Sequence, residues 1–193
     1  ATALERARAA RVESVLDAIR SKAEQADRDG EFPMEHIATF SDAGLLGLIV
    51  PEEYGGAGFG NVALAVVLEE LNRACAATGV AVSVHNSLLC APVMKFGTAE
   101  QKQRWLPRLA SGEVIGAYAL TEPQSGSDAA NMRTRAVLSE DGSHYVINGK
   151  KSWITSGPVA KYMLAFAITD PERGAKGITA FIVDTQAPGL VRG

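Results

Sequence analysis

Cysteine is scarce in this sequence, which limits the kinds of site that it can form. Only two occur among 193 residues, Cys75 and Cys90. Both lie in apolar stretches with helical patterning, and neither has the spacing of a metal ligand. We therefore expect two core cysteines, no metal site and no disulfide framework, as is usual in a reducing compartment.

The sequence also lacks an excess of positive charge and a long apolar run. Lysine and arginine total 19 against 22 acidic residues, for a net charge of -3, and no basic run occurs. This composition argues against nucleic-acid binding. No stretch of about 18 residues is apolar and uncharged throughout, so we expect no membrane span. Glu5, Glu13 and Asp17 among the N-terminal arginines fit neither a signal nor a transit peptide.

The first half of the chain has the periodicity of helices. Apolar residues make up 47% of the sequence, enough to bury a core. Val12, Leu16 and Ile19 recur at helical spacing with charged residues between them. Gly44 is expected to end a second helix, and residues 51–60 form a glycine-rich loop. The helices predicted after the first one cover residues 33–43, 61–76, 79–91 and, after a capping box at Thr98 and Gln101, 98–109.

The second half reads as strands. Asp141-Gly142 and Asn148-Gly149 are hairpin signals between runs rich in Val, Ile, Ala, Tyr and Thr. These runs are 114–121, 132–139, 144–148, 151–155, 161–169 and 177–184. The sequence therefore predicts an α+β chain. An all-α helical domain (1–113) precedes an antiparallel meander of the β-barrel or sandwich type (114–193).

The order of the two halves excludes one common cofactor fold. A doubly wound parallel sheet alternates strands with helices, and this chain does not. The segment "GGAGFG" (55–60) follows no strand of a strand–helix–strand unit, so it fails as a dinucleotide fingerprint. We interpret it as a loop that joins helices.

The loop "YALTEPQSGSDAA" (118–130) is the first candidate for a ligand site. Gly126 lets the backbone approach a ligand closely, and Ser127 and Asp128 bond readily to backbone amides. Exposed amides beside a hydroxyl suit a phosphate oxygen. The residues alone favour an ordinary turn after a strand over a ligand site.

The segment "KSWITSG" (151–157) is the second candidate. Trp153 and Thr155 are two residues apart, so in the predicted strand they share one face. An indole beside a hydroxyl would suit a planar heteroaromatic ring. The alternative is a tryptophan packed in the core of the sheet.

Taken together, these segments resemble the acyl-CoA dehydrogenase family. "YALTEPQSGSD" and "NGKKSWITSG" resemble its middle domain. "GLLGLIVPEEYGGAGFG", "NSLLCAPVMKFGTAEQKQRWLPRLASGE" and "GITAFIVDTQAPGL" follow the family in the same order, over nearly the whole chain and most firmly from about residue 30. The short-chain branch is the most similar.

The resemblance implies that both candidate loops bind FAD. Gly126 and Ser127 would lie toward the pyrophosphate and the acyl-CoA, and the residues implied at the flavin ring are Tyr118, Leu120, Thr121, Trp153, Ile154 and Thr155. A donor at Thr121 would stabilise the charge that develops on a flavin receiving a hydride. Glu122 and Asp128 are interpreted as residues that shape the loop.

The resemblance also implies an acyl-chain cavity against the helix before the β domain. Its lining would come from Val80, Ala81, Val84 and Leu88, unless these are ordinary core residues. Gly79 matches the position of an arginine in glutaryl-CoA members, which argues against a dicarboxylic substrate. His85 and Asn86 are interpreted as structural groups on the helix surface.

The implied activity is α,β-dehydrogenation of an acyl-CoA thioester to the trans-2-enoyl-CoA, within fatty acid metabolism. The family's glutamate base lies in a C-terminal helical bundle that residues 1–193 do not reach, and the β domain is expected to be incomplete. We therefore expect no catalytic base in these residues and no turnover by them alone. Alternatives are an acyl-CoA oxidase or flavin monooxygenase of the same fold, and a non-catalytic subunit with a FAD- or CoA-binding surface.

The implied partners are an electron-transferring flavoprotein and further copies of the chain. The family pattern implies a dimer or homotetramer, or a complementing C-terminal chain. The expected location is a bacterial cytoplasm, with the mitochondrial matrix as the alternative.

Overall fold

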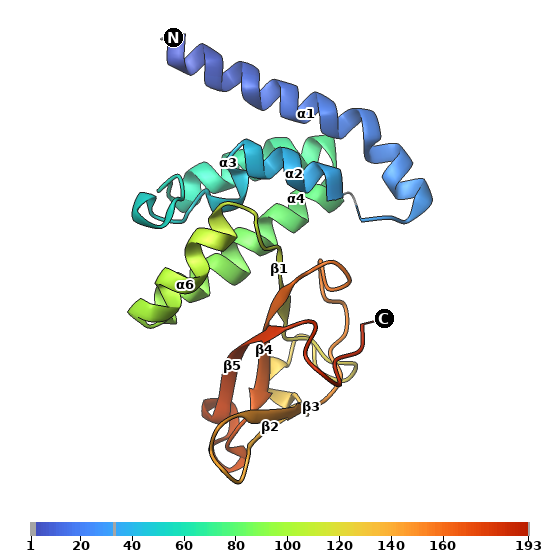
Figure 1. The fold of residues 1–193 in the computed structure, drawn as a ribbon. Helices are drawn as coiled ribbons and strands as arrows, with labels where there is room; N and C mark the ends of the chain where they lie inside the picture. Colours follow the sequence, from blue (N-terminus) through green and yellow to red (C-terminus); the bar gives the residue numbers. More distant parts are fainter. Residues whose placement is uncertain (1–2, 33, 193) are drawn as a thin grey trace. The chain divides into compact units, whose positions relative to one another are not determined.

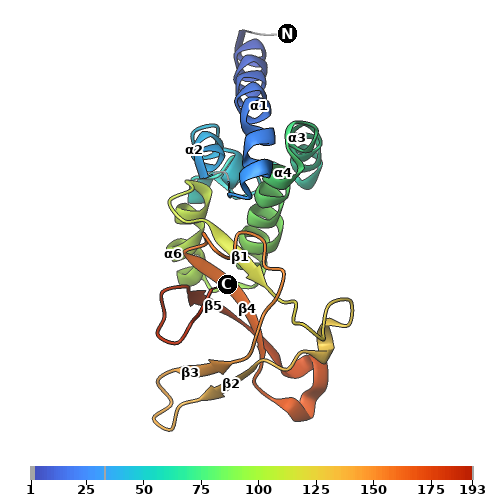
Figure 2. The same ribbon diagram turned by 90° about the vertical axis from the view of Figure 1, so that its right-hand side faces the viewer.

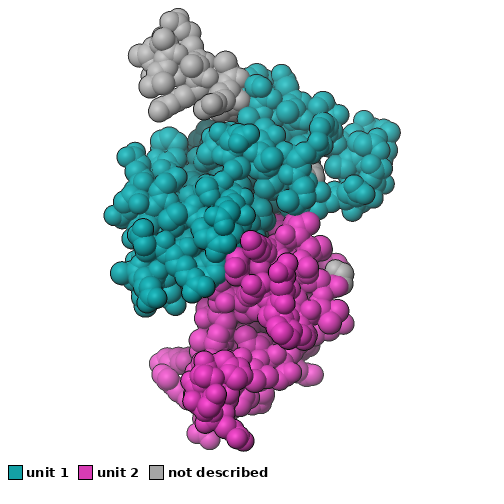
Figure 3. All heavy atoms as spheres, in the orientation of Figure 1, with its two compact units in different colours: residues 1–115 teal, residues 116–193 magenta. Residues whose placement is uncertain are grey.

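The computed structural model describes residues 3–32 and 34–192, with side chains from residue 13 onward. The chain divides into two compact units, residues 1–115 and 116–193, which are coloured separately in Figure 3. Figure 1 shows that helices make up the first unit and a sheet the second. Each unit is described by itself.

Helices in the first unit occur where the sequence pattern predicts them. Pro33, the expected first residue of the second helix, lies outside the described residues. The α-helices are α1 (Ala3–Asp29), α2 (Met34–Asp42), α3 (Asn61–Ala74), α4 (Ala76–Ser83), α5 (Ala91–Phe96) and α6 (Ala99–Ala110). The short 3-10 helices are η1 (Leu45–Gly47) and η2 (Glu52–Tyr54), and a π-helical segment, η3 (Val84–Cys90), links α4 to α5.

The termini of these helices follow the predicted signals. Thr98 accepts a hydrogen bond from the Gln101 amide at 3.2 Å, and the Gln101 side chain accepts one from the Thr98 amide at 2.9 Å. This capping box satisfies donors that the first turn of α6 would otherwise leave unpaired. Gly44 follows α2 with a φ of 73°, a left-handed conformation that glycine adopts without strain.

The glycine-rich segment 51–60 is a folded structural loop, as interpreted from its sequence. Its amides at Gly58 and Phe59 donate to the Val50 and Leu48 carbonyls, both at 2.8 Å. A side chain at Gly56 would collide with the Val50 carbonyl. Gly56 therefore has a packing explanation that involves no nucleotide.

The run from α4 to α5 is the apolar centre of the helical unit. It spans Ala76–Phe96 and, by length and composition alone, is long and apolar enough to cross a membrane. Half of its most apolar window is already buried against the protein, as in the core helix of a globular domain. Val82 in this run packs in one cluster with Leu16, Ile19, Phe40 and Leu46.

The prediction that His85 and Asn86 lie on the helix surface is wrong. Both are buried, with exposed fractions of 1% and 0%. His85 Nε2 donates to the Leu109 carbonyl at 3.0 Å, and Asn86 Nδ2 donates to the Leu45 carbonyl at 2.9 Å. Both lie in the π-helical segment, whose wider turn changes which residues face inward, and 3.6-residue periodicity does not anticipate that change.

The second unit contains one mixed sheet rather than the expected antiparallel meander. Its strands are β1 (Gly116–Ala119), β2 (Arg135–Leu138), β3 (Tyr145–Asn148), β4 (Tyr162–Ile168) and β5 (Ile178–Asp184), with 3-10 helices η4 (Ala129–Asn131) and η5 (Pro171–Gly177) between them. β4 pairs in parallel with β1 and, at one end, with β2, and antiparallel with β5. β2 and β3 form an antiparallel hairpin, visible in Figure 2.

One of the two hairpin predictions is confirmed and the other is wrong. The β2–β3 hairpin turns at Asp141-Gly142, where Gly142 has a φ of 70°. No strand follows directly after Asn148-Gly149, and residues 151–155 form no strand. A side chain at Gly149 would collide with Thr134. This glycine therefore serves close packing of the chain against Thr134 instead of a hairpin turn.

Acid should destabilise the helical unit through His85. Burial lowers the pKa of His85 to about 4, and its hydrogen bond to the Leu109 carbonyl only partly offsets this effect. Between pH of about 6.5 and 4 the unfolded chain binds a proton that the folded chain does not, so stability falls as pH falls through this window. The histidine accounts for up to about 3 kcal/mol of that loss.

The variant His85→Gln tests this contribution, since glutamine can still donate to the Leu109 carbonyl. Urea unfolding between pH 7 and 4 should give a shallower decline in the free energy of unfolding for the variant than for the wild type. Parallel declines would show that His85 does not titrate in this way.

Candidate functional site

The structure brings the two candidate loops together by direct hydrogen bonds. Leu120 and Thr121 follow β1, and their carbonyls accept bonds from the second loop. The Lys151 ammonium donates to the Leu120 carbonyl at 3.1 Å, and the Ser152 amide donates to the Thr121 carbonyl at 2.9 Å. Segments about 30 residues apart in sequence therefore form one surface within the β unit.

Glu122 is the buried centre of this junction. Its Oε1 accepts from the Lys151 ammonium at 2.8 Å and from the Thr134 amide at 3.0 Å. Its Oε2 accepts from the Arg133 amide at 2.6 Å and from the Gln124 side chain at 2.7 Å. The carboxylate thus joins the chain after β1, the chain before β2 and the segment after β3, which agrees with its interpretation as a loop-shaping residue.

The charge of Glu122 is stable in spite of its burial. Burial by itself would raise the pKa of this carboxyl. The hydrogen bonds from Lys151, Thr134, Arg133 and Gln124 outweigh burial and lower the pKa to about 2. Glu122 is therefore a fixed anion at neutral pH, and it cannot serve as a general base there.

Trp153 is neither on a strand nor in the core, so both sequence interpretations of its position are wrong. Its exposed fraction is 91%, and its φ of 60° is in the left-handed region. Ser156, three residues later, is buried with a φ of 61°. Such conformations are costly for residues other than glycine and cluster at functional sites. Ile154 and Thr155, between them, are half-buried.

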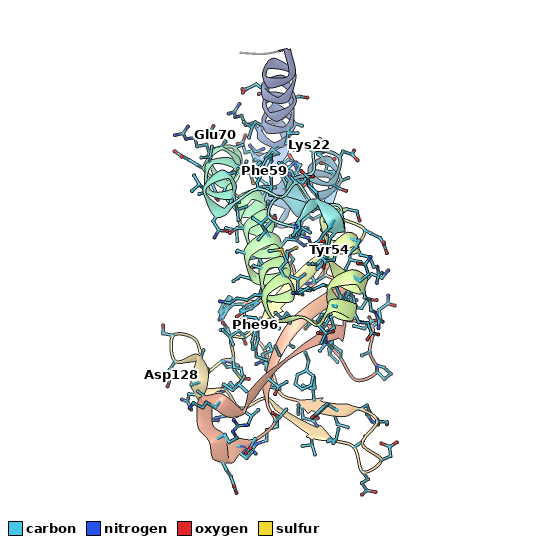
Figure 4. All side chains as sticks on the ribbon, turned by 90° about the vertical axis from the view of Figure 1, so that its left-hand side faces the viewer. Lys22, Tyr54, Phe59, Glu70, Phe96 and Asp128 are labelled. Carbon is cyan, nitrogen blue, oxygen red and sulfur yellow. The ribbon has the colours of Figure 1, made fainter. Side chains whose placement is uncertain are left out.

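The loop after Glu122 turns tightly and presents Gly126 and Ser127 to solvent. Glu122 and Ser125 bond to each other through both of their backbone groups, at 2.8 and 3.0 Å. The Ser125 hydroxyl donates to the Asp128 carbonyl at 2.8 Å. Gly126 has open space around the position of a Cβ, and Ser127 is exposed. Asp128, labelled in Figure 4, comes directly after Ser127 and is exposed.

Tyr118 differs from the neighbouring candidates because its ring already has a partner. It packs against Phe166 of the paired strand β4, with ring centroids 5.0 Å apart. Burial raises the pKa of its hydroxyl. Leu120 and Thr121, by comparison, are half-buried in the loop that follows.

The four candidate acyl-chain residues of the helical unit divide into two groups. Val80 and Leu88 are 44% and 37% exposed, and Val84 between them is half-buried, so these three form an open apolar stripe along one face. Ala81 is only 5% exposed and belongs to the core cluster. Burial therefore separates Ala81 from the three residues of the stripe.

Gly79 has a packing role that weakens its use as a sign of substrate choice. A Cβ at this position would lie 2.6 Å from the Asn72 side chain on α3. A larger residue there would point at α3, away from the stripe. The glycine therefore carries no argument about a dicarboxylic substrate.

Lys151 is the residue that the sequence interpretation missed. It is preceded by a second lysine, Lys150, and the pair reads as an ordinary solvated charge after a turn. Lys151 has a side chain only 13% exposed, whereas Lys150 is exposed. The sequence did contain one signal, the acidic Glu122 in a loop predicted to bind a ligand. A carboxylate that becomes buried needs a cation as its partner.

Family models now identify the class of this chain. The model of the acyl-CoA dehydrogenase N-terminal domain matches residues 3–113, and that of the acyl-CoA dehydrogenase middle domain matches residues 117–193. A helical unit followed by a mixed sheet is the corresponding fold. The chain therefore belongs to the acyl-CoA dehydrogenase family, which confirms the resemblance seen in the sequence.

Individual relatives show which members of the family this chain is similar to. The chain is 46% identical to the mitochondrial short-chain specific acyl-CoA dehydrogenase of Mus musculus over 171 residues, which are 89% of this chain and 41% of the mouse protein. Butyryl-CoA dehydrogenase from Megasphaera elsdenii matches 98% of this chain and 50% of its own, with a TM-score of 0.89 and 32% identity. The chain spans less than half the length of the mouse relative.

A third relative has been solved with a bound flavin. Glutaryl-CoA dehydrogenase from Mycobacterium smegmatis, in complex with FADH2, matches with a TM-score of 0.85 and 37% identity. The match covers 98% of this chain and 47% of that structure.

Neutralising Glu122 should destabilise the β unit. In Glu122→Gln an amide replaces an anion that holds four donors, so we expect a loss of about 3 kcal/mol in the free energy of unfolding at pH 7. Because the folded-state pKa is depressed, the contribution is present above pH of about 4.5 and is lost as pH falls toward 2. The difference between variant and wild type should therefore shrink in acid.

Glu140→Gln is the matched control, since Glu140 is an exposed carboxylate of the same unit. It should change stability by less than about 0.5 kcal/mol. Urea unfolding followed by circular dichroism at pH 7 and pH 3 measures both variants. A loss no larger for Glu122→Gln than for this control would contradict the role assigned to the buried carboxylate.

Proposed function

We propose that this chain is the FAD-binding part of an acyl-CoA dehydrogenase that converts a saturated acyl-CoA thioester to the trans-2-enoyl-CoA. One observation carries the proposal: the loop at Leu120–Thr121 and the loop at Ser152–Trp153 are hydrogen-bonded together and present an exposed, backbone-strained indole. A family relative solved with FADH2 supports the identity of the ligand.

The side chains at this surface suit a flavin. Trp153 offers a flat apolar ring that is 91% exposed, and Thr121 and Thr155 offer hydroxyls as hydrogen-bond donors. Ser127 and the open backbone at Gly126 suit phosphate oxygens. Glu122 is withdrawn from the surface and its charge is balanced by Lys151, so this carboxylate does not face a flavin that gains negative charge.

FAD bound here would supply the acceptor for the hydride. In the proposed roles, Thr121 and Thr155 donate hydrogen bonds that stabilise the negative charge of the reduced ring. Trp153 covers the ring and excludes water, and Tyr118, Leu120 and Ile154 shape the surrounding surface. We infer that the base that removes the α proton lies outside residues 1–193.

The acyl chain is assigned to the helical residues 1–113 and the cofactor to residues 114–193. The open stripe of Val80, Val84 and Leu88 supports an apolar tail on this helix, and the buried Ala81 is excluded from it. We propose an electron-transferring flavoprotein as electron acceptor and a homotetramer as the assembly. The proposed location is a bacterial cytoplasm, with the mitochondrial matrix as the alternative.

The reaction class can be tested by anaerobic titration of the flavin-loaded, full-length polypeptide with butyryl-CoA. Loss of the yellow flavin absorbance is expected, since hydride transfer reduces the ring. Absence of bleaching with saturated acyl-CoA substrates of any length would contradict the dehydrogenase proposal. Rapid formation of peroxide when air is admitted would instead identify an oxidase of the same fold.

Removing the exposed indole should weaken FAD binding without unfolding the protein. Trp153→Ala is expected to raise the dissociation constant of FAD about tenfold or more, because base–aromatic stacking is worth about 1–3 kcal/mol. Its free energy of unfolding should change by less than about 1 kcal/mol, since the ring is exposed. Glu53→Ala, an exposed change in the helical unit, is the control, and an equal effect of both variants on FAD affinity would refute this role of Trp153.

A further inference from the structure

The ion pair between Glu122 and Lys151 differs from the other ion pairs of the described side chains. Its two side chains are 2% and 13% exposed, whereas each of the others includes a side chain at least half exposed. A buried pair of this kind adds little net stability compared with apolar residues of similar size, because both charges lose their hydration. Its presence therefore calls for a reason other than stability.

The pair makes three hydrogen bonds to backbone groups, one of them to Leu120 of the candidate site. Lys151 binds the Leu120 carbonyl as well as the carboxylate, and Glu122 also accepts the amides of Arg133 and Thr134. An apolar pair of equal volume could fill the space but could not satisfy these groups. The charges therefore define where the chain runs at residues 120–122 and at residue 151.

Leu120, Glu122 and Lys151 lie directly beside Thr121 and Trp153, the two residues that face the proposed ligand. Thr121 lies between Leu120 and Glu122, which both contact Lys151. Trp153 is two residues after Lys151, and the intervening Ser152 amide is bonded to the Thr121 carbonyl at 2.9 Å. The exposed indole cannot hold itself in place by packing, so its left-handed backbone depends on this connection.

We propose that Glu122 and Lys151 are positioning residues that set the separation of Thr121 and Trp153, so that both meet the ring system of FAD. This inference rests on the proposed function. Glu122 is too deeply buried to meet a ligand, so it acts through the backbone that it holds. The pair preorganises the surface and lowers the ordering cost of binding.

A double-mutant cycle on FAD affinity distinguishes positioning from general stabilisation. The variants are Lys151→Met, Trp153→Ala and the two combined, made in the full-length polypeptide, with folding verified by circular dichroism. Lys151→Met should raise the dissociation constant of FAD about tenfold. If Lys151 positions Trp153, removal of the indole should cost much less in the Lys151→Met background, with a coupling of at least about threefold.

The adjacent lysine provides the matched control. Lys150→Met removes the same charge from an exposed side chain and should change FAD affinity less than about twofold, with the full effect of Trp153→Ala retained. Lys151→Arg keeps the charge and should recover part of the affinity lost in Lys151→Met. If Lys151→Met does not fold, Lys151→Gln, which can still donate to the Leu120 carbonyl, is carried through the same cycle.

The outcomes separate this inference from the function on which it rests. FAD binding that depends on Trp153 but is unchanged by Lys151→Met, or is changed additively, would overturn the positioning role and leave the proposed function intact. A wild-type protein that binds no FAD would overturn both, and FAD binding unchanged by Trp153→Ala would overturn the positioning role.

Discussion

A buried carboxylate needs hydrogen-bond donors, and the arrangement of the β unit depends on which groups donate to Glu122. Two of its donors are backbone amides and one is the Lys151 ammonium. The chain must approach the carboxylate from several directions to deliver these groups. The loops after β1 and after β3 consequently meet, and the surface presented by Thr121 and Trp153 is a result of satisfying one buried charge.

In the helical unit, buried neutral side chains likewise form hydrogen bonds to the backbone of other segments. His85 and Asn86 are enclosed by apolar neighbours, and each donates to a carbonyl at or near the end of a different helix. The polar residues on an otherwise apolar helix therefore fix its position against α6 and the chain after α2, in addition to contributing to the core.

Features that depend on local patterns could be predicted from the sequence. The capping box at Thr98, the end of α2 at Gly44 and the hairpin at Asp141-Gly142 each follow from a few adjacent residues. Features that depend on distant partners could not. The sequence could not reveal that Asn148-Gly149 serves packing against Thr134, or that the π-helical segment turns His85 inward.

In the candidate site, too, local features could be predicted from the sequence and features that depend on distant partners could not. The sequence identified its two loops through their resemblance to a family, and Glu122 was correctly interpreted as shaping its loop. No local pattern indicated that Trp153 would lie outside the sheet, because its β-rich neighbours favour a strand. The bonds of Lys151 and Ser152 to the loop after β1 depend on residues distant in sequence. Lys151 was missed because its burial depends on an acid 29 residues earlier.

The parallel pairing of β1 with β4 has a consequence for how the chain acquires its structure. Gly116 is aligned with Tyr162, so β1 has no partner in this sheet until more than forty further residues have been made. The helical unit has mostly local neighbours and can close early, whereas the sheet depends on contacts that are far apart in sequence and slow to form. On a ribosome, β1 would emerge as an unpaired apolar segment. The surface assigned to the cofactor would be among the last parts of this chain to take shape.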